Sequence, residues 1–170
     1  MSVIYTIGYE GTDIDRFVAT LKAVGVKRVA DVRAVALSRK KGFSKKSLSA
    51  RLEAEGIEYL HFVELGDPKP GREAARAGRF DEFRDIYGLH LDSDEAQASM
   101  KKLLGTVSAA PTCLLCFERD PETCHRSIVA GQLAESDFEV FDLYGDDPER
   151  YVRNGSRMPR YHPREGIAAA

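Results

Sequence analysis

The stretch that decides the fold is TCLLCFERDPETCHRSIVAGQL, residues 112–133. Its first six residues form a dense apolar run, which is typical of a buried strand. The following RDPET has the composition of a turn, and Thr123 is a good N-cap. A helical period then runs from His125 to Ala134, carried by Ile128, Val129 and Leu133. A strand, a connection and a helix therefore follow one another, which is the repeating unit of an α/β fold.

The same alternation extends in both directions along the chain. Short runs rich in β-branched and aromatic residues predict four further strands, at residues 3–7, 26–33, 57–62 and 138–144. Between them, helical periods predict helices that begin at Thr12, at Ser44 or Ser47, and at Ser93. Residues 68–88 are less regular, because Gly78 weakens the first half of a pattern in which three aromatic residues share a helical face: Phe80, Phe83 and Tyr87.

Five strands that alternate with helices predict an α/β fold, with a mostly parallel five-stranded sheet covered by helices on both faces. We expect a single three-layer domain at residues 1–145. A basic, irregular C-terminal extension at 146–170 would pack on that domain or trail from it. The order of the strands does not follow from the sequence.

The composition is that of an ordinary globular protein, with 43% hydrophobic and 31% charged residues in 170. No apolar run approaches the roughly 20 residues that a membrane span needs, so we expect no membrane partner. The N-terminus enters a strand-like run directly, without the pattern of a signal peptide. Three cysteines are an odd number, which is unsuited to a closed set of disulfides and favours a reducing cytoplasm.

Basic residues gather in two segments of the chain. Residues 32–52 contain seven lysines and arginines and no acidic residue, so all 27 acidic residues lie elsewhere. A second basic tract near the end contains Arg150, Arg153, Arg157, Arg160 and Arg164. Such segments create a local positive field that attracts anions, although many charged runs are simply solvated surface.

The loops that follow the strands are expected to hold the functional site, because sites in open α/β sheets form outside the carboxyl ends of the strands. Tyr9 and Glu10 follow the first strand, and Arg33 and Arg39 follow the second. The fourth strand leads into the connection between Cys116 and Arg126. Polar and basic side chains therefore accumulate at one edge of the predicted sheet.

The connection CFERDPETCHR, residues 116–126, has three interpretations. As a metal site it offers Cys113, Cys116, Cys124 and His125, but Cys113 and Cys116 lie three apart in a strand and should point to opposite faces. As a nucleophile loop it places Cys124, His125 and Arg126 at a helix N-terminus, where the pKa of a thiol falls and an oxyanion is bound. As a plain connection it is a well-formed turn with a helix cap, and Cys116 is a core residue.

The nucleophile interpretation is similar to the layout of rhodanese-like domains. These domains carry an Asp-Val-Arg element after an early strand, as residues 31–33 do here, and their active cysteine leads through an anion-binding loop to an Arg-Ser pair, as in Arg126 and Ser127. Two features depart from that pattern. Nine residues separate Cys116 from Arg126, where a cysteine-phosphatase loop would have five, and the loop contains acidic residues at Glu118, Asp120 and Glu122.

Four stretches together resemble a family across residues 6–133: TIGYEG, ADVRAVALSRKKGFSKKSL, GIEYLHFVELG and LLCFERDPETCHRSIVAGQL. They are similar to the bacterial and archaeal domain of unknown function family 488. The resemblance implies an α/β fold and an intracellular bacterial protein, and no established reaction. Its motif residues correspond to Tyr9, Glu10, Asp31, Arg33, Ser38, Arg39, Phe43, Lys45, His61, Glu118, Cys124, His125 and Arg126. Val35 and Ala36 stand where the family typically has a proline shortly after Asp-Val-Arg.

Two functional hypotheses have positive features in the sequence, and a third, a partner-binding domain without chemistry, has none. The first is an enzyme acting on an anionic substrate that contains phosphate, sulfur or a nucleotide, with Cys124 or Cys116 as nucleophile and His125 or Glu10 as acid or base. Asp31 would orient an arginine, and the remaining anion-site residues would be Tyr9, Arg33, Arg39, Lys45, Glu118 and Arg126. The second is a nucleic-acid-binding module that uses residues 32–52, with Tyr9, Phe43 or Tyr161 stacking on bases. Neither hypothesis assigns a cofactor or a metal, and the oligomeric state does not follow from the sequence.

Overall fold

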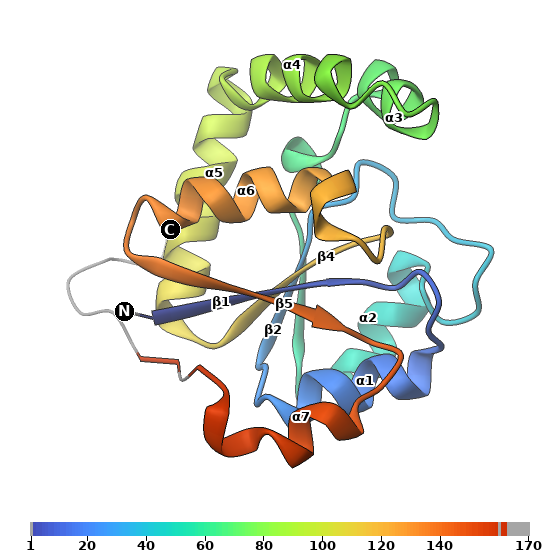
Figure 1. The fold of residues 1–170 in the computed structure, drawn as a ribbon, viewed down its shortest axis with the longest axis vertical. Coiled ribbons are helices and arrows are strands. Elements are labelled where there is room, and N and C mark those ends of the chain that lie inside the picture. Colours follow the sequence, from blue (N-terminus) through green and yellow to red (C-terminus); the bar gives the residue numbers. More distant parts are fainter. Residues whose placement is uncertain (1, 160, 163–170) are drawn as a thin grey trace.

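The computed structural model describes residues 2–159, 161 and 162, and its centre is a parallel sheet of five strands. The strands stand in the order β3-β2-β4-β1-β5 (Figure 1). Their bounds are β1 Ser2–Gly8, β2 Arg28–Asp31, β3 Glu58–His61, β4 Thr112–Cys116 and β5 Phe138–Tyr144. Every pairing is parallel, which confirms the predicted α/β sheet.

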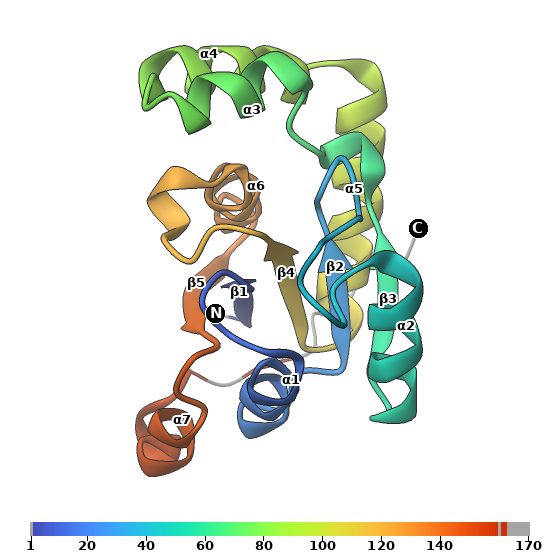
Figure 2. The same cartoon turned by 90° about the vertical axis from the view of Figure 1, so that its right-hand side faces the viewer.

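Helices cover both faces of this sheet, as predicted. One face carries α1 (Ile14–Ala23), α2 (Lys45–Ala54) and α7 (Glu149–Arg153), and the other carries α5 (Asp94–Ala109) and α6 (His125–Ala134). Figure 2 shows α3 (Lys69–Arg76) and α4 (Phe80–Leu91) lying beyond α6, farther from the sheet. Each face has its own apolar core, and alternation along β4 sends Cys113 into one core and Cys116 into the other. The predicted divergence of these two thiols is confirmed.

The strand order places the carboxyl end of β4 at a point where connections diverge. The chain leaves β1 and β2 through α1 and α2 on one face, and it leaves β3 and β4 through helices on the other face. Because β4 lies between β1 and β2, neighbouring loops separate to opposite sides of the sheet. This arrangement opens a crevice at the carboxyl ends of the strands, where ligands bind in open α/β folds.

Several elements differ from the prediction at their ends. Asp13, not Thr12, is the N-cap of α1, because its carboxylate accepts from the amide of Arg16 at 2.9 Å. Thr12 instead donates its hydroxyl to the carbonyl of Gly145. The second and third strands are shorter than predicted, whereas α5 has Ser93 as its N-cap, as predicted, and continues to Ala109.

The ambiguous region around residues 68–88 forms two helices. Gly78 has φ of +76°, a left-handed conformation that ends the first helix and starts the turn into the second. Phe83 and Tyr87 then bury one face of α4, as their spacing predicts. Gly78 therefore separates two good helical segments, where the sequence alone suggested one weak one.

Residues after Gly145 pack against the domain where the structure describes them. Tyr151 of α7 is buried in the same core as α1, and its hydroxyl accepts from the amide of Tyr144 at 2.6 Å. Tyr161 is half-buried and donates to the carbonyl of Ser108 at 2.7 Å. Arg150, Arg153 and Arg157 of the basic tract are exposed, whereas Arg160 and Arg164 lie outside the described residues. The division at residue 145 stays a prediction.

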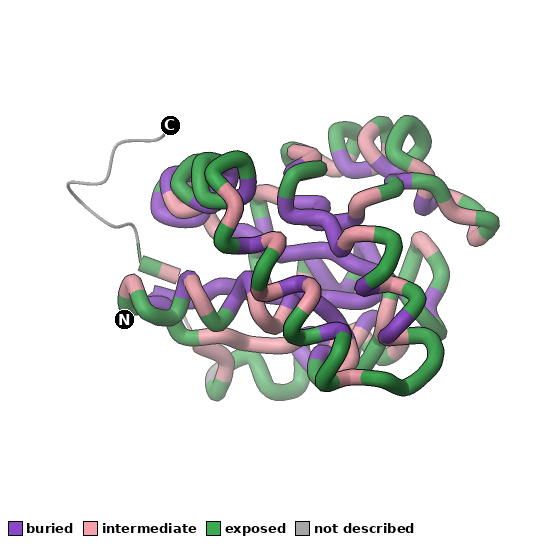
Figure 3. The backbone as a smooth tube through the Cα atoms, turned by 90° about the horizontal axis from the view of Figure 1, so that it is seen from above, coloured by how far each residue is buried: buried purple, intermediate pink, exposed green. Residues whose placement is uncertain are grey.

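Burial follows the layers of the fold. Viewed from above in Figure 3, buried segments run along the strands and the inner sides of the helices, and exposed segments form the outer turns. Among the described residues, none of the helices has the length and apolar character needed to cross a membrane.

Candidate functional site

A cavity of about 470 Å³ lies at the carboxyl ends of the strands, within the usual volume range of small-molecule sites. It is bounded by the loops after β1, β2 and β4 and by helices α3 and α4. Its polar lining includes Arg33, Asp67, Arg72, Arg76, Cys116, Glu118, Thr123 and His125, and its apolar lining includes Tyr9, Val35, Leu37, Phe83 and Phe117. The cavity therefore lies where the strand-end rule predicts a site.

Two thiols and an imidazole meet beside this cavity. The Nδ1 atom of His125 is 3.7 Å from Sγ of Cys116 and 4.0 Å from Sγ of Cys124. Cys116 ends β4, and Cys124 and His125 begin α6, so the intervening loop returns the chain to the place where the strand ended. Cys116 and His125 line the cavity, and Cys124 lies behind them, only 1% exposed.

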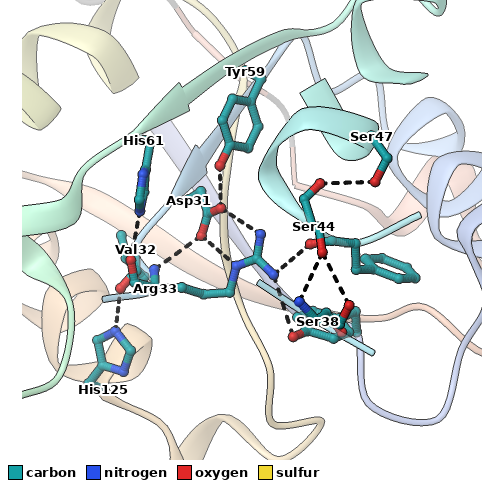
Figure 4. A network of polar contacts seen from close by, with 11 residues as sticks. Asp31, Val32, Arg33, Ser38, Ser44, Ser47, Tyr59, His61 and His125 are labelled. Atoms are coloured by element: carbon teal, nitrogen blue, oxygen red, sulfur yellow. Dashed lines mark hydrogen bonds and ion pairs between the residues drawn. The ribbon is translucent and has the colours of Figure 1, made fainter. Parts of the chain in front are cut away.

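The imidazole of His125 is held in one orientation by the backbone of the neighbouring strand. Its Nε2 is 2.6 Å from the carbonyl oxygen of Val32, directly after β2 (Figure 4). Because a carbonyl only accepts, Nε2 must carry the hydrogen, and this leaves Nδ1 directed toward the two thiols. The ring of Tyr87 packs beside the imidazole with a centroid distance of 5.1 Å.

Cys116 and Cys124 titrate as a pair that shares one negative charge. Burial opposes ionisation of Cys124, but hydrogen bonds with Cys116 and His125 and the charges of His125 and Arg126 hold its pKa well below that of an ordinary thiol. The hydrogen bond with Cys124, together with burial, keeps the pKa of Cys116 well above the ordinary value. The pair thus yields its first proton easily and its second with difficulty.

His125 is the counter-charge of this pair. Burial alone would lower its pKa, but the hydrogen bond and charge of Cys124 outweigh that effect and raise the pKa to about 8. An imidazolium beside a thiolate at a helix N-terminus is an arrangement that activates cysteine nucleophiles.

Two carboxyl groups of the cavity wall are difficult to ionise. Burial and the charge of Cys124 raise the pKa of Glu118 to about 7, and its Oε2 is 3.6 Å from Sγ of Cys116. Burial raises the pKa of Asp67 to about 6. Asp67 is 4% exposed, and within the described part of the chain its Oδ1 has no hydrogen-bond partner. Both groups are able to exchange a proton near neutral pH.

Asp31 and Arg33 form a buried ion pair, which Figure 4 shows at the end of β2. Two guanidinium nitrogens of Arg33 reach the carboxylate of Asp31 at 2.8 and 2.9 Å, and the third donates to the carbonyl of Phe43 at 2.7 Å. Tyr59 donates its hydroxyl to the same carboxylate. Asp31 thus orients an arginine as expected, but the donors of that arginine are used within the protein.

Arg126 is fully buried and also used internally. Its guanidinium donates to the carbonyls of Glu118 and Arg119 and, at 3.2 Å, to the hydroxyl of Thr6. It therefore fastens the loop after β4 to the sheet, and it is not among the residues that line the cavity. Its charge still acts on Cys124, whose pKa it helps to lower.

A model of the family described as domain of unknown function DUF488 matches residues 13–133 of the chain, well over half of its length. The chain belongs to this family. No curated protein and no solved structure matches it. The similarity to rhodanese-like domains therefore stays a prediction.

The other DUF488 motif residues are placed around the cavity rim or away from it. Tyr9 lines the cavity, with its ring stacked on Phe43 at 4.6 Å. Glu10 is exposed and accepts from the amide of Arg119 at 3.0 Å, which ties the loop after β1 to the loop after β4. Arg39 and Lys45 are exposed and stand outside the cavity lining.

The basic segment of this family member, residues 32–52, is partly used in internal contacts. Arg33 pairs with Asp31, Lys40 donates to the carbonyls of Tyr9 and Thr12, and Arg51 pairs with Asp15 and Glu55. Exposed cations of the segment are Arg39, Lys41, Lys45 and Lys46. Phe43 is fully buried and Tyr9 is 4% exposed, so neither ring presents an open stacking platform. Nucleic-acid binding stays a prediction.

The sequence analysis does not identify three charged residues that line the cavity on the side of α3. Asp67 lies in the loop before α3, and Arg72 and Arg76 lie on α3 itself, in the region where the sequence pattern is irregular. The signal that was available is the LGDPKPGR stretch after the third strand, which the strand-end rule already selects. The sequence offers Cys116, Cys124 and His125 as members of a possible metal set, but their convergence depends on the path of a loop, which residue types do not give.

Proposed function

We propose that this protein is an enzyme that acts on an anionic substrate, containing phosphate, sulfur or a nucleotide, in the cavity at the carboxyl ends of the strands. The observation that carries the proposal is the position of Cys116 and His125 in the cavity wall, with their reactive atoms 3.7 Å apart. A thiol and an imidazole held together in a small-molecule cavity supply a nucleophile and a neighbouring acid or base, which nucleophilic catalysis requires.

The division of labour follows from exposure. Cys116 lines the cavity, so its sulfur is the atom that a substrate reaches. Cys124 is buried away from the cavity and carries the negative charge of the pair in the resting state. The Cys116 thiol would pass its proton to the Cys124 thiolate as its sulfur forms a bond to the electrophilic phosphorus, sulfur or carbon atom, and the bond to the leaving group would break. His125 would hand its proton to that leaving group. Glu10 is not among the residues that line the cavity, and its carboxylate accepts from the amide of Arg119, so we assign the proton transfer to His125.

The anionic character of the substrate is supported by the charge at the cavity mouth. Arg72 and Arg76 lie one turn apart on α3 and both line the cavity. The two carboxyl groups of the cavity lining, Asp67 and Glu118, have pKa values raised toward neutrality, so they oppose an anion less than ordinary carboxylates would. Arg33 adds positive charge to the wall, although Asp31 balances most of it.

Protection from alkylation tests both parts of the proposal. Reduced, metal-free protein is treated with iodoacetamide at pH 7 in the presence of inorganic phosphate, sulfate or AMP, and the modified cysteines are located by mass spectrometry. We expect Cys116 to be modified first and at least one of the three anions to protect it in a saturable manner. Arg76→Ser should weaken that protection, because Arg76 lines the cavity.

The matched control is Arg84→Ser, which removes an exposed arginine of α4 that lies outside the cavity lining and should leave protection unchanged. Turnover is tested by intact-mass detection of an adduct on Cys116 after incubation with an aryl phosphate, an aryl sulfate or thiosulfate. Unmodified Cys116 under all conditions, or equal effects of Arg76→Ser and Arg84→Ser, would refute the proposal.

A further inference from the structure

We propose that Cys116, Cys124 and His125 also form a binding site for a thiophilic divalent cation, with zinc as the best match. The proposal goes beyond the enzymatic function suggested above and does not rest on it. It is carried by the convergence of three ligand atoms, Sγ, Sγ and Nδ1, which all lie within 4.8 Å of one another.

The spacing of these atoms suits a tetrahedral metal. With Zn–S bonds of about 2.3 Å and Zn–N bonds of about 2.0–2.1 Å, neighbouring ligand atoms are separated by roughly 3.5–3.8 Å. Nδ1 of His125 is 3.7 Å from Sγ of Cys116 and 4.0 Å from Sγ of Cys124. Shifts of a few tenths of an ångström would bring Nδ1 to the required separation from each sulfur. The two sulfur atoms, which lie within 4.8 Å of each other, would have to approach by up to about 1 Å.

The contacts of the histidine favour metal binding as well. Zinc-binding histidines usually donate their other ring nitrogen to a carbonyl or carboxylate, which fixes the tautomer and the ring orientation. Nε2 of His125 makes this contact with the carbonyl of Val32 at 2.6 Å. Nδ1 therefore points toward the sulfur atoms before any metal arrives, and a metal would displace its proton.

The ligand set identifies the class of metal. Two thiolates and one imidazole select zinc over magnesium or calcium, which prefer oxygen ligands. Cys113, which would complete a four-ligand set in the sequence, is directed into the core on the opposite face of the sheet. Three protein ligands leave the fourth position to water or a substrate atom from the cavity, because Cys116 and His125 both line it.

Zinc binding and thiol chemistry would exclude each other at this cluster. A metal-bound thiolate has its electron pair engaged in the metal bond, so it is a poorer nucleophile than the free thiolate. Addition of zinc should therefore protect Cys116 from iodoacetamide, and removal of zinc by a chelator should restore the reaction. The metal-bound and metal-free states are then distinguishable by the reactivity of one residue.

The test uses the full chain, reduced and freed of metal with EDTA. Titration with Co²⁺ should give a thiolate-to-cobalt charge-transfer band and the visible bands of a tetrahedral complex, and competition with a chromophoric chelator should give one zinc per chain. Cys116→Ser, Cys124→Ser and His125→Asn should each weaken zinc binding by at least about 100-fold. Cys113→Ser is the matched control and should bind as the parent protein does, because that thiol faces the other core.

Circular dichroism shows whether each variant folds. If a variant does not fold, the rise in melting temperature on addition of zinc is measured for the parent chain and for Cys113→Ser, and both should show it. The proposal is overturned if the parent chain binds no zinc at micromolar concentrations, or if folded Cys116→Ser and Cys124→Ser bind it as tightly as the parent. Its failure would leave the thiol enzyme untouched. Conversely, tight zinc binding with an inert Cys116 in the metal-free protein would refute the enzyme and keep the metal site.

Discussion

At the scale of single residues, the site is distinguished by which polar groups are satisfied and which are not. The guanidinium donors of Arg33 and Arg126 are committed to carboxylate, carbonyl and hydroxyl groups of the protein, as expected for buried charges. Asp67 is the opposite case, since one of its buried oxygens has no partner among the described residues. Such a group in a native protein calls for a specific explanation, such as a catalytic role or a bound water or ion.

The first prediction concerns the stability cost of Asp67. Its pKa is raised from 3.8 to about 6 in the folded protein, so the unfolded chain ionises first as pH rises. The folded state is therefore destabilised progressively between about pH 4 and 6, by up to ~3 kcal/mol at pH 7. Asp67→Asn should raise the free energy of unfolding by about 2–3 kcal/mol at pH 7 and leave it unchanged below pH 4.

Urea denaturation at several pH values measures this effect. Asp85→Asn, which changes an exposed aspartate of α4, is the control and should alter the free energy of unfolding by less than ~0.5 kcal/mol. A loss of stability in Asp67→Asn at pH 7 would show that the carboxylate is well satisfied in the folded protein.

At the scale of elements, β1 and the loop after β4 must approach very closely for the cysteine cluster to form. Gly8 at the end of β1 is paired in register with Cys116 at the end of β4. A Cβ atom on Gly8 would lie 1.7 Å from the carbonyl oxygen of Glu118, the same oxygen that accepts from Arg126. Gly8 thus permits the path of the loop that returns Cys124 and His125 to Cys116.

The second prediction follows from this contact. Gly8→Ala should lower the free energy of unfolding by roughly 1–3 kcal/mol or more, because backbone and not a flexible side chain must move. Gly131→Ala is the matched control, since nothing lies within 4 Å of its added Cβ and the residue is exposed on α6. That variant should gain about 0.5–1 kcal/mol from helix propensity. Equal stability of the two variants would contradict the proposed close approach.

The elements also separate what the sequence predicts from what it does not. The apolar pattern of the sequence predicts the five strands and α6. Burial on both faces gives β4 a continuous apolar run, and burial of one side gives α6 a helical stripe. The pattern is ambiguous around Gly78, where a left-handed turn splits two helices. The pattern does not predict that Asp67 and Arg72 line the same cavity as Cys116, because this depends on where the chain places α3 relative to the sheet.

At the scale of the whole molecule, the strand order brings distant segments to one cavity. Residues around 9, 33, 67, 116 and 125 meet because β4 lies between β1 and β2 and the helical connections return over opposite faces. No local sequence pattern encodes the strand order. The sequence therefore predicts that the site lies at the carboxyl ends of the strands, but not which side chains meet there. The segment after Gly145 contributes to the core from the opposite end of the chain.

The third prediction tests whether this last segment is part of the folded unit. Tyr151 is 4% exposed and packs in the core beneath α1. Tyr151→Ala should lower the free energy of unfolding by about 3 kcal/mol or more, as for other buried aromatic residues. Its neighbour Val152 is 64% exposed, so Val152→Ala should change stability by less than ~0.5 kcal/mol. Urea denaturation of both variants measures the two free energies of unfolding. An unchanged value for Tyr151→Ala would mean that the segment trails from the domain.

The most direct test of the central claim is the pH dependence of alkylation at Cys116 in reduced, metal-free protein. The first proton of the Cys116–Cys124 pair is lost easily, and proton exchange between the two sulfurs then gives Cys116 a share of the thiolate. The rate at Cys116 should therefore follow this first ionisation and be half-maximal below pH 8, and His125→Asn should move that midpoint upward. Cys113 should stay unmodified, since burial raises its pKa. A midpoint near 8.5, the value of a free thiol, with no response to His125→Asn, would contradict the account.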